Sequence, residues 1–251
     1  MINLINLPRL FFVVSLVVLW SFALLGAFVG QRVRPLHEEE RDDFGVVQTA
    51  VLTLLGLLIG FTFSMAVSRY DQRKNYEEAE ANAIGTEYVR ADLLPSADAE
   101  QVRNLLRKYL DQRILFYMTR DESQLEQINS ATAQLQTELW SAVLTRAATT
   151  PTPVISLAVS GMNDVLNSQG YTQAAWWNHI PAAAWALLVV IAICCSVLVG
   201  YGMHRNRRLL TVILPFAVSV SFLLIADIDS PRRGLIRVQP QNLISLSQSL
   251  H

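Results

Sequence analysis

Four long apolar runs constrain the fold of this chain more than any other feature. They cover residues 10–30, 46–67, 180–202 and 209–226, and none of them contains a charged side chain. About 20 apolar residues in a helix are long enough to cross the hydrocarbon core of a bilayer, which is roughly 30 Å thick. Backbone groups in hydrocarbon must bond within their own segment, so each run should be a helix. The sequence therefore predicts an all-α, polytopic membrane protein with four transmembrane helices.

The runs form two hairpins with a long polar stretch between them. We expect an N-terminal transmembrane hairpin over residues 1–67, a soluble helical domain over 68–179, and a C-terminal transmembrane hairpin with a short tail over 180–251. Within the polar stretch, apolar side chains recur at helical spacing. Leu94 precedes Pro95 and should end a helix that continues from the second run, because the residue before proline is disfavoured in a helix. The soluble domain is therefore expected between transmembrane helices 2 and 3.

Composition excludes several classes of function. Charged residues make up only 16% of the chain and the net charge is -1, so there is no basic surface for a nucleic-acid partner. The only cysteines, Cys194 and Cys195, are neighbours inside the third run, and the four histidines are scattered, so no metal-ligand spacing is present. Phosphate-binding glycine loops and nucleophile elbows are also missing. The sequence predicts no enzyme activity, no metal and no cofactor.

The second run contains a row of residues that share one helix face. Thr53, Leu57 and Phe61 are spaced four apart, and the same row leads towards Arg69. One interpretation is that these side chains face lipid or a helix bundle core. The other is that several copies of this helix surround an axis, where rings of Leu57 and Phe61 form a pore constriction that gates by dewetting. Arg69 would then form a positive collar at the pore exit.

Small residues are spaced four apart in the first two runs. Gly26 and Gly30 lie in the first run, and Gly56 and Gly60 lie in the second. This spacing lets helix backbones approach closely, so we expect the four glycines at helix–helix contacts.

Charged residues next to the runs should have partners. Asp227 and Asp229 end the fourth run, where acidic side chains are unfavourable at a helix C-terminus. We expect an interfacial ion pair with Arg232 and Arg233. The carboxylate-rich stretch 71–87 is interpreted as a solvated helix face with basic partners one turn away.

The end of the second run resembles a known signature. Residues 60–69, Gly-Phe-Thr-Phe-Ser-Met-Ala-Val-Ser-Arg, look like the bestrophin motif in which a Gly-Phe pair is followed, eight residues after the Phe, by an Arg. The whole chain is similar to the bacterial bestrophin-like family of unknown function. The residues that carry this likeness lie at 68–71, 80–86, 90–95, 227–231 and 234–236.

The resemblance implies an assembly and a pore. Bestrophin neck residues fall on Thr53, Leu57 and Phe61, although bestrophin necks are apolar at all three levels and Thr53 departs from that pattern. A homo-oligomer, pentameric in bestrophins, is implied by the resemblance alone. So are a bacterial inner membrane and a cytoplasmic location of both termini and the central domain. No acidic cluster after the last run matches the calcium clasp of bestrophins, so calcium gating is not implied.

Two functions from different classes follow. The first is a bestrophin-like, passive small-anion channel of chloride type, with the bilayer and other copies of the chain as partners. The alternative is a non-conducting membrane scaffold or sensor whose soluble helical domain binds an unidentified protein partner. The polar Thr53 and the acidic loop at 38–43 favour the alternative.

Overall fold

The computed structural model describes residues 7–33, 37–203 and 211–250. Within these ranges the chain is helical and contains no strand, which confirms the all-α prediction. The helices are α2 (Pro8–Phe28), α3 (Glu40–Arg90), α4 (Ser96–Met118), α5 (Glu122–Thr149), α6 (Pro153–Trp177), α7 (Ala182–Tyr201), α8 (Ile213–Asp229) and α9 (Gln241–Ser249). A π-helical turn, η1 (Val29–Val33), extends α2, and a 3-10 turn, η2 (Ala91–Leu93), ends α3.

Within the described part of the chain, three helical stretches are long and apolar enough to cross a membrane. They are Pro8–Val33, Glu40–Leu93 and Pro153–Tyr201. The last of these includes α6, and its apolar part corresponds to the predicted run 180–202. The fourth predicted run corresponds to α8, which has 17 residues and is about 25 Å long. Residues 209 and 210 of that run and the predicted link 204–208 lie outside the described residues, so the four-span count stays a prediction.

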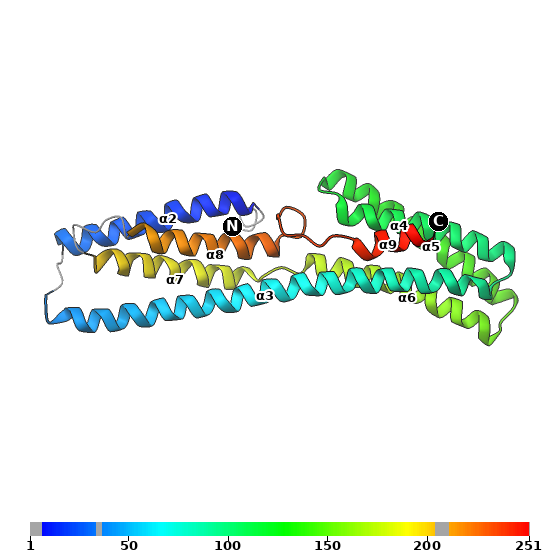
Figure 1. Cartoon of the computed structure of the whole chain (residues 1–251), viewed down its shortest axis with the longest axis horizontal. Helices are drawn as coiled ribbons and strands as arrows, with labels where there is room; N and C mark the ends of the chain where they lie inside the picture. Colours follow the sequence, from blue (N-terminus) through cyan, green and yellow to red (C-terminus); the bar gives the residue numbers. More distant parts are fainter. Residues whose placement is uncertain (1–6, 34–36, 204–210, 251) are drawn as a thin grey trace. The chain divides into compact units, whose positions relative to one another are not determined.

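The chain divides into two compact units, and α3 contributes to both (Figure 1). The first unit comprises residues 1–69 and 179–237. In it α2 packs against α7 and α8. Three aromatic rings join these helices: the Phe11 and Trp185 centroids lie 5.3 Å apart edge to face, and Phe222 stacks on Phe11 at 5.9 Å. Aromatic pairs in these geometries stabilise by about 0.5–1.5 kcal/mol beyond their buried area.

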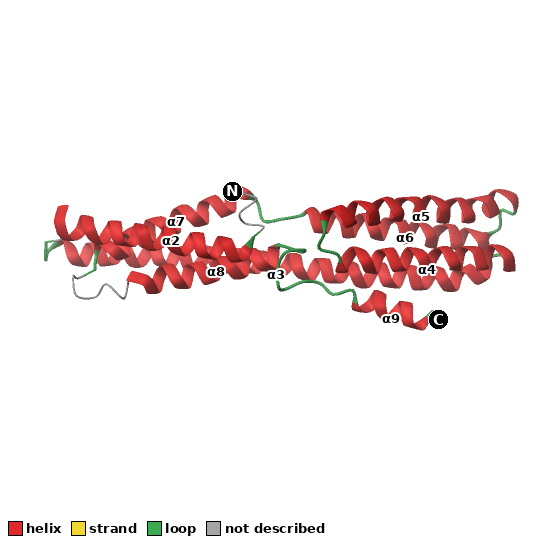
Figure 2. Ribbon diagram, turned by 90° about the horizontal axis from the view of Figure 1, so that it is seen from above, coloured by secondary structure: helices red, strands yellow, loops and turns green. Residues whose placement is uncertain are grey.

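The second unit comprises residues 70–178 and 238–251. Figure 2 shows α4, α5 and α6 side by side, with α9 next to α4, and α4 contacts both α5 and α9. The core of this unit includes the fully buried side chains of Leu106, Leu139 and Met162. As the sequence predicts, the helix before Pro95 ends there, and α4 begins at Ser96. The C-terminal residues belong to this unit, whereas the predicted division placed them with the C-terminal transmembrane hairpin.

Candidate functional site: the two faces of α3

The predicted row on α3 is exposed. Leu57 and Phe61 are 52% and 60% exposed, and Thr53 is exposed with its hydroxyl donating to the Thr49 carbonyl at 2.8 Å. Leu55 and Thr62, on the opposite side of the helix, are buried in the first unit. The row therefore points away from the packed side of its own unit. An exposed stripe of this kind is available to lipid, to an aqueous path or to another protein chain.

Arg69 is the last residue of the first unit and is partly buried. It lies eight residues after Phe61 in the same continuous helix, which is about 12 Å along the axis. This is the first charged side chain on α3 after the apolar run.

The four glycines of the predicted packing pattern have different surroundings. A Cβ on Gly26 would collide with the Val197 carbonyl oxygen, and a Cβ on Gly30 would collide with the Tyr201 carbonyl oxygen. These two glycines therefore allow the close backbone approach of α2 and η1 to α7. Gly56 and Gly60 have open space where a Cβ would point. A packing role for this second pair requires a partner outside the chain and stays a prediction.

The two aspartates at the end of α8 bind backbone N–H groups. Asp227 accepts from Leu235 at 2.8 and 2.9 Å and from Ile236 at 2.8 Å. Asp229 accepts from the Ile180 N–H at 3.1 and 3.3 Å, and its Oδ2 lies 3.5 Å from His179 Nδ1. The carboxylates thus hold the loop after α8 and the start of the segment leading to α7.

The predicted ion pair of Asp227 and Asp229 with Arg232 and Arg233 stays a prediction. The contacts described above join Asp227 to backbone N–H groups, and Asp229 to the Ile180 N–H and the His179 ring. Sequence reasoning could not find these contacts, because backbone donors carry no residue-specific signal.

The interpretation of residues 71–87 as a solvated helix face is wrong for one side of the helix, although Asp71, Lys74 and Glu78 are exposed as expected. Arg73, Glu77, Glu80 and Glu87 are at most 1% exposed. Their spacing of four, three and seven places them on one face of α3, and this face is turned into the second unit. Burial of a charged group is unfavourable unless it is paired, so each of these side chains requires a specific environment.

Arg73 and Glu77 hold the ends of two other helices. Arg73 donates from Nε to the Ala175 carbonyl at 3.2 Å and from Nη2 to the Asn178 carbonyl at 3.1 Å, at the C-terminal end of α6. Glu77 accepts from the N–H groups of Asn242 at 2.9 Å and Leu243 at 3.0 Å, at the N-terminus of α9. A cation at a helix C-terminus and an anion at an N-terminus both complement the helix dipole.

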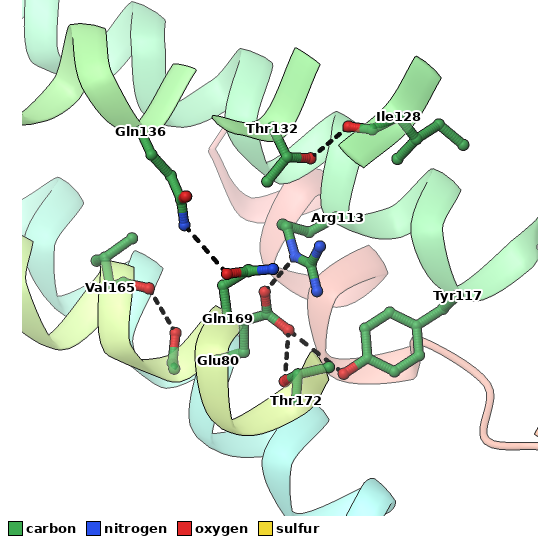
Figure 3. Close-up of polar contacts among 10 residues, drawn as sticks. Glu80, Arg113, Tyr117, Ile128, Thr132, Gln136, Val165, Gln169 and Thr172 are labelled. Atoms are coloured by element: carbon green, nitrogen blue, oxygen red, sulfur yellow. Dashed lines mark hydrogen bonds and ion pairs between the residues drawn. The ribbon is translucent and has the colours of Figure 1, made fainter. Parts of the chain in front are cut away.

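Glu80 is the centre of a buried polar cluster (Figure 3). It forms an ion pair with Arg113 of α4, and both side chains are fully buried. It also accepts from the Thr172 hydroxyl of α6 at 3.1 Å and from the Tyr117 hydroxyl at 3.3 Å. Close by, Gln136 of α5 donates to Gln169 of α6 at 3.5 Å. The cluster thus joins α3, α4 and α6 through one carboxylate.

Electrostatics in this cluster favour a charged Arg113 and a neutral Tyr117. Burial alone would lower the pKa of Arg113, but the adjacent Glu80 outweighs it and raises that pKa. Burial, and then the negative charge of Glu80, raise the pKa of Tyr117. The guanidinium also lies over the Phe116 ring, 4.4 Å from its centroid. The arrangement fixes helix register and offers no reactive group.

The described residues contain no constellation for metal binding. In residues 7–33, 37–203 and 211–250, no group of three His, Cys, Asp or Glu side chains is placed to hold a metal ion. An open groove of about 640 Å³ lies between α4 and α5, and it contains an Arg146–Asp98 pair at 2.6 Å.

Solved structures share this fold. Three crystal structures of variants of a bacterial bestrophin homologue from Klebsiella pneumoniae match with TM-scores of 0.70, 0.67 and 0.65 and sequence identities of 12%, 12% and 14%. Each match covers 95% of this chain and 95–97% of the other. At these identities the likeness establishes the fold and nothing finer.

The family follows from the sequence comparison. Among curated proteins, none matches the chain significantly. The model of the bestrophin-like domain matches residues 17–243, which is most of the chain. With its apolar helices, the chain is an integral membrane protein that belongs to the bestrophin-like family.

Proposed function

We propose that this protein assembles into a homo-oligomer that passes small anions of chloride type passively along the exposed face of α3. The observation that carries the proposal is the position of Thr53, Leu57 and Phe61. These side chains lie in the apolar part of a membrane-crossing helix, yet they point away from the packed side of their own unit. Identical copies around an axis would bring the three side chains together as three rings.

The charge pattern of α3 in the second unit supports self-association. Between residues 70 and 93 the chain carries nine charged side chains: Asp71, Arg73, Lys74, Glu77, Glu78, Glu80, Glu87, Arg90 and Asp92. One row of residues on this part of α3 is spaced alternately three and four apart, as in coiled coils, and it contains none of these charged side chains. It consists of exposed residues only, namely Gln72, Asn75, Ala79, Asn82, Thr86, Val89 and Leu93.

Symmetry explains why such a row would be uncharged. Around a rotation axis each residue near the axis faces its own copies, so a charged residue there would face like charges. The polar members of the row suit a water-lined surface better than a dry helix seam, where apolar residues are preferred. By the resemblance to bestrophins, we propose that the assembly has five copies.

The chemistry of the proposed path suits a small anion. Rings of Leu57 and Phe61 would close the path by dewetting, and the ring edges of phenylalanine carry the positive part of its quadrupole. Thr53 would add a polar ring next to this constriction. Arg69, the first charge after the apolar run, would form a positive collar.

Membrane placement follows from the same charges. Ionisable side chains are expensive in hydrocarbon, so we infer that the second unit lies in water and that the bilayer surrounds residues 46–67 of α3. The fourth crossing would be α8. By analogy with the family, we propose that the termini and the second unit lie in the cytoplasm and that the protein lies in a bacterial inner membrane.

The scaffold or sensor function stays as the second candidate. The acidic residues Glu38, Glu39, Asp42 and Asp43 are exposed near the start of α3. Negative charge at a pore mouth repels anions, and this observation favours a non-conducting protein whose second unit binds a protein partner.

Water access to residue 57 separates the two functions. In a background without Cys194 and Cys195, Leu57→Cys should react with a membrane-impermeant, hydrophilic thiol reagent. The matched control is Leu55→Cys on the same helix, because Leu55 is only 1% exposed and should be protected. Arg69→Cys should react whether the protein is a channel or a non-conducting scaffold. Protection of Leu57→Cys in the assembled protein would contradict a water-filled path along α3.

A further inference from the structure

Glu87 differs from the other buried charged side chains of α3. It is 0% exposed, and neither of its carboxylate oxygens has a hydrogen-bond partner. Arg73, Glu77 and Glu80 on the same face are each bonded to another helix. Buried polar groups in proteins are almost always hydrogen-bonded, so an isolated carboxyl group is unusual.

A glycine of α6 creates the space that Glu87 occupies. A Cβ on Gly161 would collide with Oε2 of Glu87 and would also meet the Arg90 side chain. The carboxyl group therefore lies directly against the α6 backbone. A side chain at position 161 would have to displace the Glu87 carboxyl group, so this contact depends on the glycine.

The surroundings of Glu87 favour its neutral form. Burial raises the pKa of Glu87 from 4.5 to about 8; Arg90 on α3 opposes this increase and Asp164 on α6 adds to it. Arg90 is partly exposed and Asp164 is exposed, so water screens both of these charges. Desolvation thus dominates, as expected for a carboxylate without donors.

We propose that Glu87 is held as a neutral carboxylic acid in the folded second unit, and that the loss of its proton as the pH rises towards 8 loosens the contact between α3 and α6. The effect is local to the contact between Glu87 and Gly161. The neutral acid fits against Gly161, whereas the carboxylate requires water or a hydrogen-bond donor, which the closed contact does not supply. Because α3 also carries the exposed row Thr53, Leu57 and Phe61, a change at Glu87 acts on the helix that the proposed function uses.

The direction of the pH effect follows from the two protonation states. With the contact closed, Glu87 binds its proton with a pKa of about 8; with the contact open and the side chain in water, the pKa returns towards 4.5. The closed contact is therefore most stable at low pH and loses stability as the pH rises towards 8. Between pH 4.5 and about pH 8 the fraction of molecules with the contact open increases by up to about tenfold per pH unit. Above about pH 8 this fraction stays constant.

Amide hydrogen exchange on the full-length protein in nanodiscs tests the proposal. Protection of α6 peptides around Gly161, corrected for the intrinsic pH dependence of exchange, should fall several-fold per pH unit from pH 6 to 8 and then level off. Peptides from α5 should not show this fall. In Glu87→Gln the protection around Gly161 should be independent of pH, whereas Glu78→Gln, an exposed carboxylate on the same helix, should keep the wild-type profile.

Two results would overturn the proposal. One is a wild-type protein whose protection around Gly161 does not change between pH 6 and 8. The other is the same decline in Glu87→Gln as in the wild type. Glu87→Leu also lacks the titrating group. This second variant is measured if Glu87→Gln does not fold. The readout involves no ion flux, so the outcome is independent of the proposed channel function.

Discussion

Removal of one partner from the buried Glu80–Arg113 pair should destabilise the second unit strongly. Both side chains are fully buried, and Glu80 also accepts from Thr172 and Tyr117. Glu80→Gln keeps the size of the side chain but leaves the Arg113 guanidinium charged in the bundle core. Breaking a buried pair in this way costs about 3–5 kcal/mol. At roughly 4 °C per kcal/mol for a unit of this size, Tm should fall by about 12–20 °C.

The assay is thermal and denaturant unfolding of the purified protein, compared with two further variants. Glu78→Gln, exposed on the same helix, should change the free energy of unfolding by no more than about 0.5 kcal/mol. The double variant Glu80→Met, Arg113→Met replaces the pair with apolar side chains and should come within about 2 kcal/mol of the wild type. The reasoning is refuted by a loss below about 1 kcal/mol in Glu80→Gln, or by a double variant that is at least as unstable as Glu80→Gln.

Two further predictions concern helix contacts. Gly26→Ala should lower the free energy of unfolding by about 1–3 kcal/mol, because its methyl group would collide with the α7 backbone. The control is Gly45→Ala, where the structure has open space, and in thermal melts this variant should be neutral or slightly stabilised. Glu77→Ala should release α9, because the α9 N-terminus loses its carboxylate partner at a cost of about 1–3 kcal/mol. Limited proteolysis within residues 238–250 should then be several-fold faster than in the wild type, and an unchanged cleavage rate would contradict the docking role of Glu77.

The membrane part of the fold could be predicted because its signals are local. Uncharged runs of about 20 residues identify helices without any knowledge of their neighbours. The end of α3 before Pro95 is a property of the proline itself. The exposed row at Thr53, Leu57 and Phe61 also follows from helical spacing, although spacing cannot say which side of the helix is packed.

The buried polar face of α3 could not be predicted from local patterns. Charged residues three and four apart are usual on a solvated helix, and the sequence of residues 71–87 shows nothing else. Burial of Glu77 and Glu80 depends on α9 and α4, which come from distant parts of the chain. The nine-residue α9 gives only a weak signal, namely Pro240 before a short amphipathic segment.

Chloride efflux from proteoliposomes tests the central claim most directly. The purified wild-type protein is compared with the double variant Leu57→Ala, Phe61→Ala, and with Phe63→Ala as the matched control on another face of α3. The account predicts efflux that increases or changes anion selectivity in the double variant, while Phe63→Ala behaves as the wild type. Efflux absent from all three proteins, or altered equally by Phe63→Ala, would contradict a constriction formed by Leu57 and Phe61.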